Sequence, residues 1–372
     1  MYKVLHIMAG ADAGGISAVV LNYYKYINKE RIHFDIALTT GQFGKNGIIL
    51  EKMGVKFFHI PQKSIDIKLF EEKLGEILVT GNYDCIHVHE NETSYIALRI
   101  AKKLGIKKRI AHCHTTSPYS SLKNELRRIS GCILNGIYST NLIACGKVAG
   151  DRVFGKYNMT REKALILPNA VEIERFAFDY NIRKQIRAEL GIEDKFVIGM
   201  IGRLSVQKNY KFAIDVVQRV ILEDSEVVFL IVGNGELEQQ LKEYVSEKGI
   251  SSNVLFLGKR DDVNRLYMGF DYFILPSLYE GFPVVAVEAL TSGLNIMISD
   301  TITPELSVFK QVTYCTIKDS VKWAEKILSD RKKIKVSIEK RQNARFVVSS
   351  QGYDIKDTVK LLEDVYLSKE VG

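Results

Sequence analysis

The chain has 372 residues, of which 46% are hydrophobic and 26% are charged, and its formal net charge is +8. This composition is that of an ordinary soluble globular protein, and the length suggests two domains. No apolar run approaches the roughly 18 to 20 residues that a membrane-spanning helix needs, so we expect no transmembrane segment. The first apolar run is short and is broken by Asp12, so we interpret it as a strand rather than a signal peptide. The five cysteines form no C-x-x-C pair, which fits reduced side chains in a cytoplasmic protein.

Short apolar runs alternate with helix-period segments from one end of the chain to the other. The alternation predicts parallel sheets with helices on both faces, and two series of strands predict two doubly wound α/β domains. We assign residues 1–175 to the first domain and 176–352 to the second, and an apolar stripe predicts a last helix at about 353–368. The first series of predicted strands is 4–8, 34–38, 56–60, 85–88, 109–113, 142–145 and 164–167, and the second is 196–201, 227–232, 254–257, 272–275 and 295–299.

The excess positive charge lies in the first half of the chain. Residues 1–180 have a net charge of +8, whereas residues 181–372 have equal numbers of acidic and basic side chains. Ordinary surface variation could produce this difference, and so could an acidic partner such as an anionic membrane or a phosphorylated lipid. Nucleic acid is not expected, because no basic patch is interleaved with aromatic residues. Segment 121–139 carries an apolar stripe beside Arg127 and Arg128, so it is either a helix packed on its own sheet or an interfacial membrane helix.

The stretch 277–290, SLYEGFPVVAVEAL, follows a predicted buried strand and contains two carboxylates. Gly281 marks a turn, and Pro283 is expected at the first position of a helix, where its missing N–H costs nothing. The start of such a helix offers unpaired N–H groups and a positive dipole end, which suit a phosphate. Glu288 lies among apolar residues, where a carboxylate must be paired or exposed. A local partner or solvent exposure would satisfy Glu288 without any ligand.

The spacing from Glu280 to Glu288, with Gly-Phe-Pro after the first glutamate, resembles the signature of the family-4 retaining glycosyltransferases of the GT-B fold. The resemblance implies two Rossmann-like domains that face one another across a cleft, an N-terminal acceptor domain and a C-terminal donor domain, with the last helix packed back on the first. It implies that Glu280 contacts hydroxyl groups of the donor sugar and that Glu288 holds the ribose of the nucleotide. The diphosphate is then expected to meet the backbone of Gly281, Phe282, Pro283, Val284 and Val285.

Further residues match the family in the same order along the chain. Gly14 and Gly15 follow the first predicted strand, where the family has a Gly-Gly loop beside the donor phosphates, although Gly turns after strands are common. His114 matches a histidine near the donor sugar. Arg203 and Lys208 match the motif G-R-x4-K, whose two cations bind the diphosphate and stabilise it as a leaving group. As isolated features, these two cations would be solvated loop residues.

The stretch PNAVE at 168–172 corresponds to the P-N-G-V-D of the family, so Asn169 is expected to bind the donor. Two departures from the family pattern occur near it. Ala170 replaces the usual glycine, which removes one close backbone approach, and Cys145 replaces a serine near the end of the preceding strand.

All seven histidines lie at or before residue 114, and two H-x-H pairs occur, His87 with His89 and His112 with His114. Alternate residues of a strand face the same way, so either pair could bind a metal, as in metal hydrolases. No two Asp residues are separated by one residue, so the chain lacks the D-x-D motif that holds a divalent ion in many nucleotide-sugar enzymes. We therefore expect a metal-independent enzyme without a cofactor.

Together the matches predict a glycosyltransferase that moves a hexose-type sugar, with retention, from a nucleotide-diphosphate sugar that is a UDP-sugar by analogy. The expected catalytic residues are His114, Arg203, Lys208 and Glu280. The expected acceptor is a glycan or a polyprenyl-diphosphate-linked glycan in capsule, exopolysaccharide or other surface-polysaccharide synthesis. The expected location is cytoplasmic, peripheral at the inner face of the plasma membrane. Two alternatives remain: a nucleotide-sugar epimerase of the same fold, and a metal hydrolase built on the H-x-H pairs.

Overall fold

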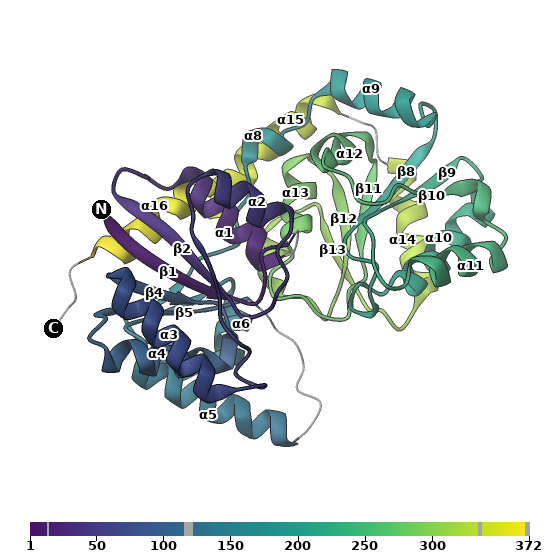
Figure 1. Cartoon of the computed structure of the whole chain (residues 1–372). Helices are drawn as coiled ribbons and strands as arrows, with labels where there is room; N and C mark the ends of the chain where they lie inside the picture. The colour runs from purple at the N-terminus through teal and green to yellow at the C-terminus, as the bar shows by residue number, and fades with distance from the viewer. Residues whose placement is uncertain (13–14, 115–121, 334–336, 369–372) are drawn as a thin grey trace. The chain divides into compact units, whose positions relative to one another are not determined.

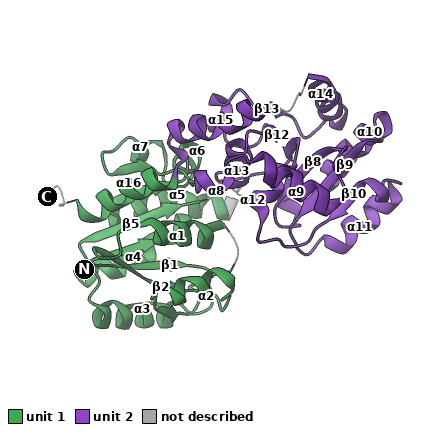
Figure 2. Ribbon diagram, turned by 90° about the horizontal axis from the view of Figure 1, so that it is seen from above, with its two compact units in different colours: residues 1–170, 355–372 green, residues 171–354 purple. Residues whose placement is uncertain are grey.

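The computed structural model of the protein describes residues 1–12, 15–114, 122–333 and 337–368. The chain divides into two compact units, which are residues 1–170 together with 355–372, and residues 171–354 (Figure 2). The first unit therefore ends a few residues before the boundary expected at 175. Each unit is a sheet flanked by helices (Figure 1).

The first unit contains a seven-stranded sheet in the order β3-β2-β1-β4-β5-β6-β7, in which every neighbouring pair is parallel. The order reverses between β1 and β4, as in a doubly wound sheet. The loops that follow these two strands lie at the switch point, where open α/β sheets bind their ligands. The strands are β1 (Tyr2–Met8), β2 (Ile32–Leu38), β3 (Phe57–His59), β4 (Cys85–Val88), β5 (Lys108–Cys113), β6 (Asn141–Ala144) and β7 (Ala164–Ile166).

Helices cover both faces of this sheet, with α1 and α16 on one side and α3, α4 and α5 on the other (Figure 1). Tyr23 of α1 and Leu362 of α16 join Val4 and Phe34 of the strands in one core. The C-terminal helix is thus part of the hydrophobic core of the first unit. The helices are α1 (Gly15–Tyr26), α2 (Lys45–Lys52), α3 (Ile67–Gly81), α4 (Ser94–Lys103), α5 (Leu122–Tyr138), α6 (Lys147–Val153), α7 (Lys156–Met159) and α16 (Ile355–Leu367), with a 3-10 turn η1 (Asn91–Thr93).

The second unit contains a six-stranded parallel sheet in the order β10-β9-β8-β11-β12-β13. Its switch point lies between β8 and β11, so the loops after these strands are the expected ligand-binding edge. The strands are β8 (Phe196–Ile201), β9 (Val227–Val232), β10 (Val254–Phe256), β11 (Tyr272–Leu275), β12 (Asn295–Ser299) and β13 (Val312–Cys315).

The helices of the second unit bury the single tryptophan of the chain, Trp323, in the core beside β8 and β9. The helices are α8 (Ile173–Phe176), α9 (Tyr180–Leu190), α10 (Tyr210–Glu223), α11 (Glu238–Glu247), α12 (Val263–Gly269), α13 (Val284–Thr291), α14 (Ser320–Lys333) and α15 (Ile338–Val348). Shorter turns are η2 (Val206–Lys208), η3 (Ser251–Asn253), η4 (Pro304–Val308) and the π-helical turn η5 (Ser349–Tyr353).

A buried group of three arginines joins α9, α12 and α15. Arg183 Nη2 donates to Asp271 Oδ1 at 2.5 Å, and Arg187 Nη1 donates to Asp271 Oδ2 at 3.1 Å. Arg341 donates instead to backbone carbonyl groups around the end of α12, where the helix dipole favours a cation. Burial lowers the pKa of the Arg341 guanidinium to about 9. Among the described residues, Asp271 is therefore the only acidic residue that forms ion pairs with these arginines.

The predicted architecture of two doubly wound α/β halves is confirmed. Strands β8, β9, β11 and β12 have the predicted bounds, whereas β13 is absent from the prediction because its four residues are only half-buried. Among the residues that the structure describes, no helix is both long enough and apolar enough to cross a membrane.

Candidate active site

Two loops meet at the switch point of the second sheet. Because β8 and β11 are neighbours, the loops that follow them leave the same edge side by side. Leu278 N–H donates to the carbonyl of Gln207 at 2.8 Å, and Gln207 Nε2 donates to the carbonyl of Tyr279 at 2.9 Å. Asn209 Nδ2 donates to the carbonyl of Pro276 at 3.2 Å. These three bonds fix the loops against each other and so fix the side chains that the loops carry.

The two loops bring Lys208 and Glu280 into contact. Lys208 Nζ lies 2.6 Å from Glu280 Oε1, and the two side chains are only 15% and 10% exposed. An ion pair with so little solvent contact is weakly screened, and removing either partner would leave a poorly solvated charge. The pair places an ammonium, which suits a phosphate, beside a carboxylate that can accept hydrogen bonds from hydroxyl groups.

Arg203 lies on the β8 loop but points to a different carboxylate. Its Nε and Nη2 lie 3.1 Å from Glu236 Oε2, and the two side chains are 74% and 51% exposed. A pair this exposed contributes about 0–1 kcal/mol, so Arg203 can change partner at little cost. Glu236 was not anticipated from the sequence.

A glycine pair explains how Glu236 reaches the β8 loop. Gly233 has φ +135°, and a Cβ there would lie 2.0 Å from the carbonyl oxygen of Gly202. A Cβ on Gly235 would lie 2.4 Å from the carbonyl oxygen of Leu204. Only glycine permits this approach of the β9 loop to the β8 loop. The G-x-G spacing at 233–235 is therefore the sequence signal for the position of Glu236.

The turn before α13 presents backbone amides at the same edge of the sheet. The Phe282 ring is 5% exposed and stacks on Tyr353 with 5.4 Å between ring centroids, which anchors the turn in the core. Pro283, with φ −80° and ψ 89°, is the N-cap of α13 and not its first helical residue as predicted. The ring of proline fixes φ only, and ψ remains extended until the helix begins at Val284. The first N–H groups of α13 have no intrahelical acceptor, which suits an anion.

Glu288 has a local partner on α12. Its Oε2 accepts a hydrogen bond from the Tyr267 hydroxyl at 2.8 Å, and the same hydroxyl lies 3.1 Å from the carbonyl of Val285. Burial raises the pKa of the Glu288 carboxyl from its ordinary value of 4.5 to about 7, although the Tyr267 hydrogen bond opposes this change. The carboxylate is thus costly in the protein without a ligand, and further hydrogen-bond donors would stabilise it.

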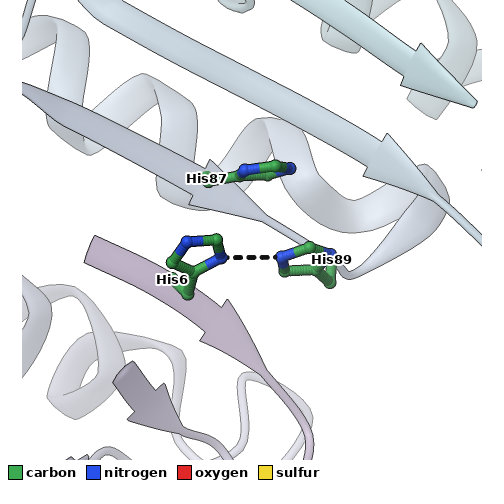
Figure 3. Close-up of side chains that lie close together, drawn as sticks. All are labelled: His6, His87 and His89. Carbon is green, nitrogen blue, oxygen red and sulfur yellow. Dashed lines mark hydrogen bonds between the residues drawn. The ribbon is translucent and has the colours of Figure 1, made fainter. Parts of the chain in front are cut away.

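In the first unit, five histidines gather on the face of the sheet that α1 and α16 cover. His6 of β1 lies opposite His87 of β4 in the strand register, and His89 follows two residues later on the same face (Figure 3). His6 Nδ1 and His89 Nε2 are 3.0 Å apart, and His89 Nδ1 and His114 Nε2 are 2.8 Å apart. A three-member chain of imidazoles therefore runs from the buried β1 strand to the end of β5.

A second chain begins at the C-terminal helix. The Tyr366 hydroxyl lies 2.7 Å from His87 Nδ1, and His87 Nε2 lies 3.1 Å from His112 Nδ1. Burial lowers the pKa of His87, His89 and His112 well below the ordinary value, and it lowers the pKa of His6 to about 3. These imidazoles are therefore neutral at physiological pH, with one donor and one acceptor nitrogen each.

The neutral state gives the two hydrogen bonds between His6 and His114 a common direction. Burial also lowers the pKa of His114 to about 3. Both end nitrogens, Nε2 of His6 and Nδ1 of His114, lack a hydrogen-bond partner among the described residues. Both of these nitrogens are buried. Each neutral imidazole has one donor and one acceptor nitrogen, so the two hydrogen bonds of this chain run in the same direction, either both toward His114 or both toward His6.

Comparison with known proteins identifies the family. Residues 13–175 match the family model described as Glycosyltransferase Family 4, and residues 182–344 match Glycosyl transferases group 1. The chain is 30% identical over 372 residues to the putative glycosyltransferase EpsF of Bacillus subtilis (strain 168), which covers 98% of this chain and 96% of the relative. The chain belongs to the group 1 and family 4 glycosyltransferases.

Two further proteins resemble this glycosyltransferase. One is the UDP-Gal:alpha-D-GlcNAc-diphosphoundecaprenol alpha-1,3-galactosyltransferase of Escherichia coli, 27% identical over 291 residues that cover 75% of this chain and 74% of the relative. The other is the crystal structure of Anabaena HepE in complex with UDP, with a TM-score of 0.83 and 18% identity over 99% of this chain and 100% of that one. At this identity the structural likeness shows the fold, which is GT-B as predicted.

The structure places the other predicted residues of the glycosyltransferase at separate points of the first unit. Gly15 is the first residue of α1, and a Cβ there would meet no atom within 4 Å, so packing does not require glycine. Gly14 lies outside the described residues. Asn169 is 6% exposed, and its Oδ1 lacks a partner in the described part of the chain. Ala170, the departure from the family pattern, is buried in the core of the first unit.

The histidines also form two groups with metal-ligand geometry. The nitrogens of His6, His87 and His89 lie within 4.8 Å of one another, as do those of His89, His112 and His114. Both groups consist of histidine alone. Neutral histidines are ordinary Zn²⁺ ligands in catalytic sites, so the metal-hydrolase hypothesis has a geometric basis.

Sequence reasoning noted the G-x-G spacing at 233–235 but missed two residues of the candidate site besides Glu236. Tyr267 lies on α12, where no motif distinguishes it from other buried tyrosines. Gln207 joins the two loops through both its backbone and its side chain. Its position inside the G-R-x4-K motif was the only available signal.

Proposed function

We propose that this glycosyltransferase transfers a hexose-type sugar from a UDP-sugar to a glycan or polyprenyl-diphosphate-linked acceptor with retention of configuration. The observation that carries the proposal is the Lys208–Glu280 pair, held by two hydrogen-bonded loops at the switch point and next to the start of α13. The ammonium group and the unpaired amides suit the phosphates of a nucleotide-sugar donor, and the carboxylate suits the hydroxyl groups of its sugar.

The proposed reaction needs positioning and charge stabilisation more than covalent chemistry. The bond between the anomeric carbon and the diphosphate oxygen breaks, and the acceptor oxygen forms a new bond to that carbon on the same face. The acceptor hydroxyl gives its proton to the leaving diphosphate. Lys208 and Arg203 stabilise the charge that develops on the diphosphate, and the exposed pair of Arg203 with Glu236 opens readily for this purpose. No cofactor or metal ion takes part.

Glu280 and Glu288 bind the two ends of the donor in this proposal. Glu280 accepts hydrogen bonds from the sugar hydroxyls. Glu288 accepts from the ribose, which supplies donors to a carboxylate whose pKa burial has raised to about 7. From the first unit we propose that His114 hydrogen-bonds the donor sugar, and that Gly14, Gly15 and Asn169 complete the donor site.

Relatives support the donor, the acceptor and the location. The E. coli relative is named for UDP-Gal and for a diphosphoundecaprenol-linked acceptor, and HepE is in complex with UDP. Because a polyprenyl-linked acceptor is anchored in a membrane, we propose a cytoplasmic enzyme peripheral at the inner face of the plasma membrane. A role in capsule, exopolysaccharide or other surface-polysaccharide synthesis follows from this acceptor class.

Thermal denaturation with a panel of nucleotide sugars tests the donor assignment, because a ligand that binds the folded state raises the Tm. UDP and at least one UDP-sugar should raise the Tm, and Lys208→Ala should lower the transfer rate on the order of 100-fold by loss of leaving-group stabilisation. Lys211→Ala, three residues later and exposed on α10, is the matched control and should retain full activity. Full activity of Lys208→Ala would contradict the phosphate role. An epimerised nucleotide sugar without transfer to an added acceptor would favour the epimerase alternative.

A further inference from the structure

Helix α5 carries a row of large apolar side chains on its outer surface, which we call the α5 face. Leu126, Ile129, Ile133 and Ile137 are 60%, 45%, 56% and 54% exposed. Their spacing of three and four residues keeps them on one side of the helix over about 16 Å. Single exposed apolar residues are common, but an aligned row of four is a feature of interaction surfaces.

The remaining sides of α5 are committed to the first unit. Asn135 Nδ2 donates to the carbonyl groups of Asn91 and Glu92 on one side. Cys132 Sγ donates to the carbonyl of Phe154 on the other side, and Asn158 Nδ2 donates to the carbonyl of Cys132. The helix is thus packed and hydrogen-bonded without using the α5 face. The apolar stripe from Leu126 to Ile137 therefore does not pack on its own sheet, which was one of the two hypotheses for the segment.

Basic side chains flank the α5 face. Arg127 is 60% exposed, and Lys102 Nζ lies 5.6 Å from the centre of the Tyr138 ring at the end of α5. Lys103 is exposed on the same helix as Lys102. Residues 101–150 contain nine Lys and Arg but one acidic residue.

The acidic residue in that range is Glu125, which is paired with Arg128 at 2.7 Å. Arg128 also donates to the carbonyl of Arg152 at 3.0 Å, so its side chain is committed to the fold. Arg128 is therefore a poorer membrane contact than the sequence suggested. Arg127 Nε lies 4.0 Å from Glu92 Oε1, but its side chain is 60% exposed, and the lysines of α4 are exposed too.

We propose that the α5 face docks the protein on the surface of an anionic lipid bilayer. The aliphatic side chains would enter the headgroup boundary, and Arg127, Lys102 and Lys103 would contact anionic headgroups. A second copy of the chain fits less well, because two copies of the α5 face would bring like charges together. Nucleic acid fits less well, because the row has aliphatic side chains where single-strand binders use aromatic rings.

The inference deepens the proposed function, since it names the surface by which the enzyme would reach a membrane-anchored acceptor. It can nevertheless be tested without any transfer reaction. If vesicle binding fails while UDP binding and transfer remain, the membrane surface is wrong and the proposed reaction stands. If vesicle binding holds while no nucleotide sugar binds, the proposed reaction is wrong and the α5 face stands.

Co-sedimentation with vesicles of phosphatidylcholine and phosphatidylglycerol measures the binding, with vesicles of phosphatidylcholine alone as the reference. The wild type should bind the anionic vesicles and lose binding as salt increases. The triple variant Ile129→Ser, Ile133→Ser, Ile137→Ser removes the apolar part and should weaken binding at least tenfold. The triple variant Lys102→Ser, Lys103→Ser, Arg127→Ser removes three charges and should weaken it on the order of 100-fold.

Each variant has a matched control on another surface. The control for the isoleucine variant is the triple variant Ile65→Ser, Val79→Ser, Leu222→Ser. It removes apolar residues that lie elsewhere and are 77%, 63% and 76% exposed. The control for the charge variant is the triple variant Lys184→Ser, Lys259→Ser, Lys340→Ser, which removes three exposed charges from the second unit. Both controls should bind vesicles as the wild type does, and all variants should keep the wild-type Tm and UDP binding.

Three results would overturn the proposal. The first is wild-type binding that is absent at low salt or equal on neutral vesicles. The second is an unchanged affinity of the folded α5 variants. The third is a dimer in light scattering that the isoleucine variant dissociates, which would make the α5 face a contact between copies.

Discussion

Replacing Glu288 by Gln should stabilise the second unit, and the gain should grow with pH. Burial raises the pKa of this carboxyl to about 7 in the folded protein, from an ordinary value of 4.5. Between these values the folded state binds a proton that the unfolded state releases. Stability is therefore lost as the pH rises through about 7, and it is fully present only below the unfolded value. Glutamine keeps an acceptor for the Tyr267 hydroxyl and does not ionise.

The size of the effect follows from the same pKa values. Each pKa unit corresponds to about 1.4 kcal/mol, so full ionisation of Glu288 costs about 3 kcal/mol of folding free energy. Part of this cost is already present at pH 5, because the unfolded carboxyl is mostly ionised there. The stability difference between Glu288→Gln and the wild type should therefore grow by about 2 kcal/mol between pH 5 and pH 8.

Trp323 provides the assay, because it is the only tryptophan and is buried in the unit that contains Glu288. Urea unfolding followed by its fluorescence gives the free energy at each pH. Glu247→Gln, on the exposed end of α11, is the matched control and should show no pH-dependent difference from the wild type. A difference for Glu288→Gln that does not change from pH 5 to pH 8 would refute the argument from burial.

The same linkage predicts how the nucleotide binds. If the ribose supplies donors to the Glu288 carboxylate, it binds the ionised form more tightly, so UDP affinity should increase as the pH rises through about 7. The pH dependence of UDP binding to the Glu288→Gln variant contains every other titration, including that of UDP itself. The difference between the two proteins therefore isolates Glu288.

Two further predictions concern the metal and the buried arginines. Transfer should persist after treatment with EDTA, because Lys208, Arg203 and the amides before α13 replace a divalent ion; a complete loss that Mn²⁺ or Mg²⁺ restores would contradict this. Asp271→Asn should lower the free energy of unfolding of the second unit by about 3–5 kcal/mol, because Arg183 and Arg187 would lose their buried counter-charge. Urea unfolding followed by Trp323 fluorescence measures this loss, and a change below about 1 kcal/mol would contradict it.

The sequence predicted those parts of the fold that depend on short-range patterns. Strands β8, β9, β11 and β12 are buried on both faces, so they appear as continuous apolar runs with clear limits. Strand β13 lies at the edge of the sheet and its residues are half-buried, so its apolar pattern is weak. The apolar stripe of α5 was visible in the sequence as a repeat of apolar residues every three or four positions. Such a repeat does not say whether the apolar face meets the core or the solvent.

In the candidate site, too, the sequence predicted what lies within one strand or loop but not which strands are neighbours. H-x-H spacing predicted that His87 and His89 share a face, yet it could not bring in His6, because that requires β1 and β4 to be neighbours. The contact of Lys208 with Glu280 likewise depends on the pairing of β8 with β11, across 72 residues of sequence. Spacing rules describe one strand or helix at a time, and topology supplies what lies beside it.

The place of α16 has a consequence for how the protein is made. The first unit consists of two stretches of the chain, and Leu362 and Tyr366 fill its core only after the second unit has been synthesised. The second unit is one continuous stretch, so on the ribosome it can reach its final fold while the first unit still lacks a helix. Until α16 arrives, only α1 covers the face of the first sheet that carries His87, and a nascent chain stalled before residue 355 would expose the rest of that apolar surface to chaperones and proteases.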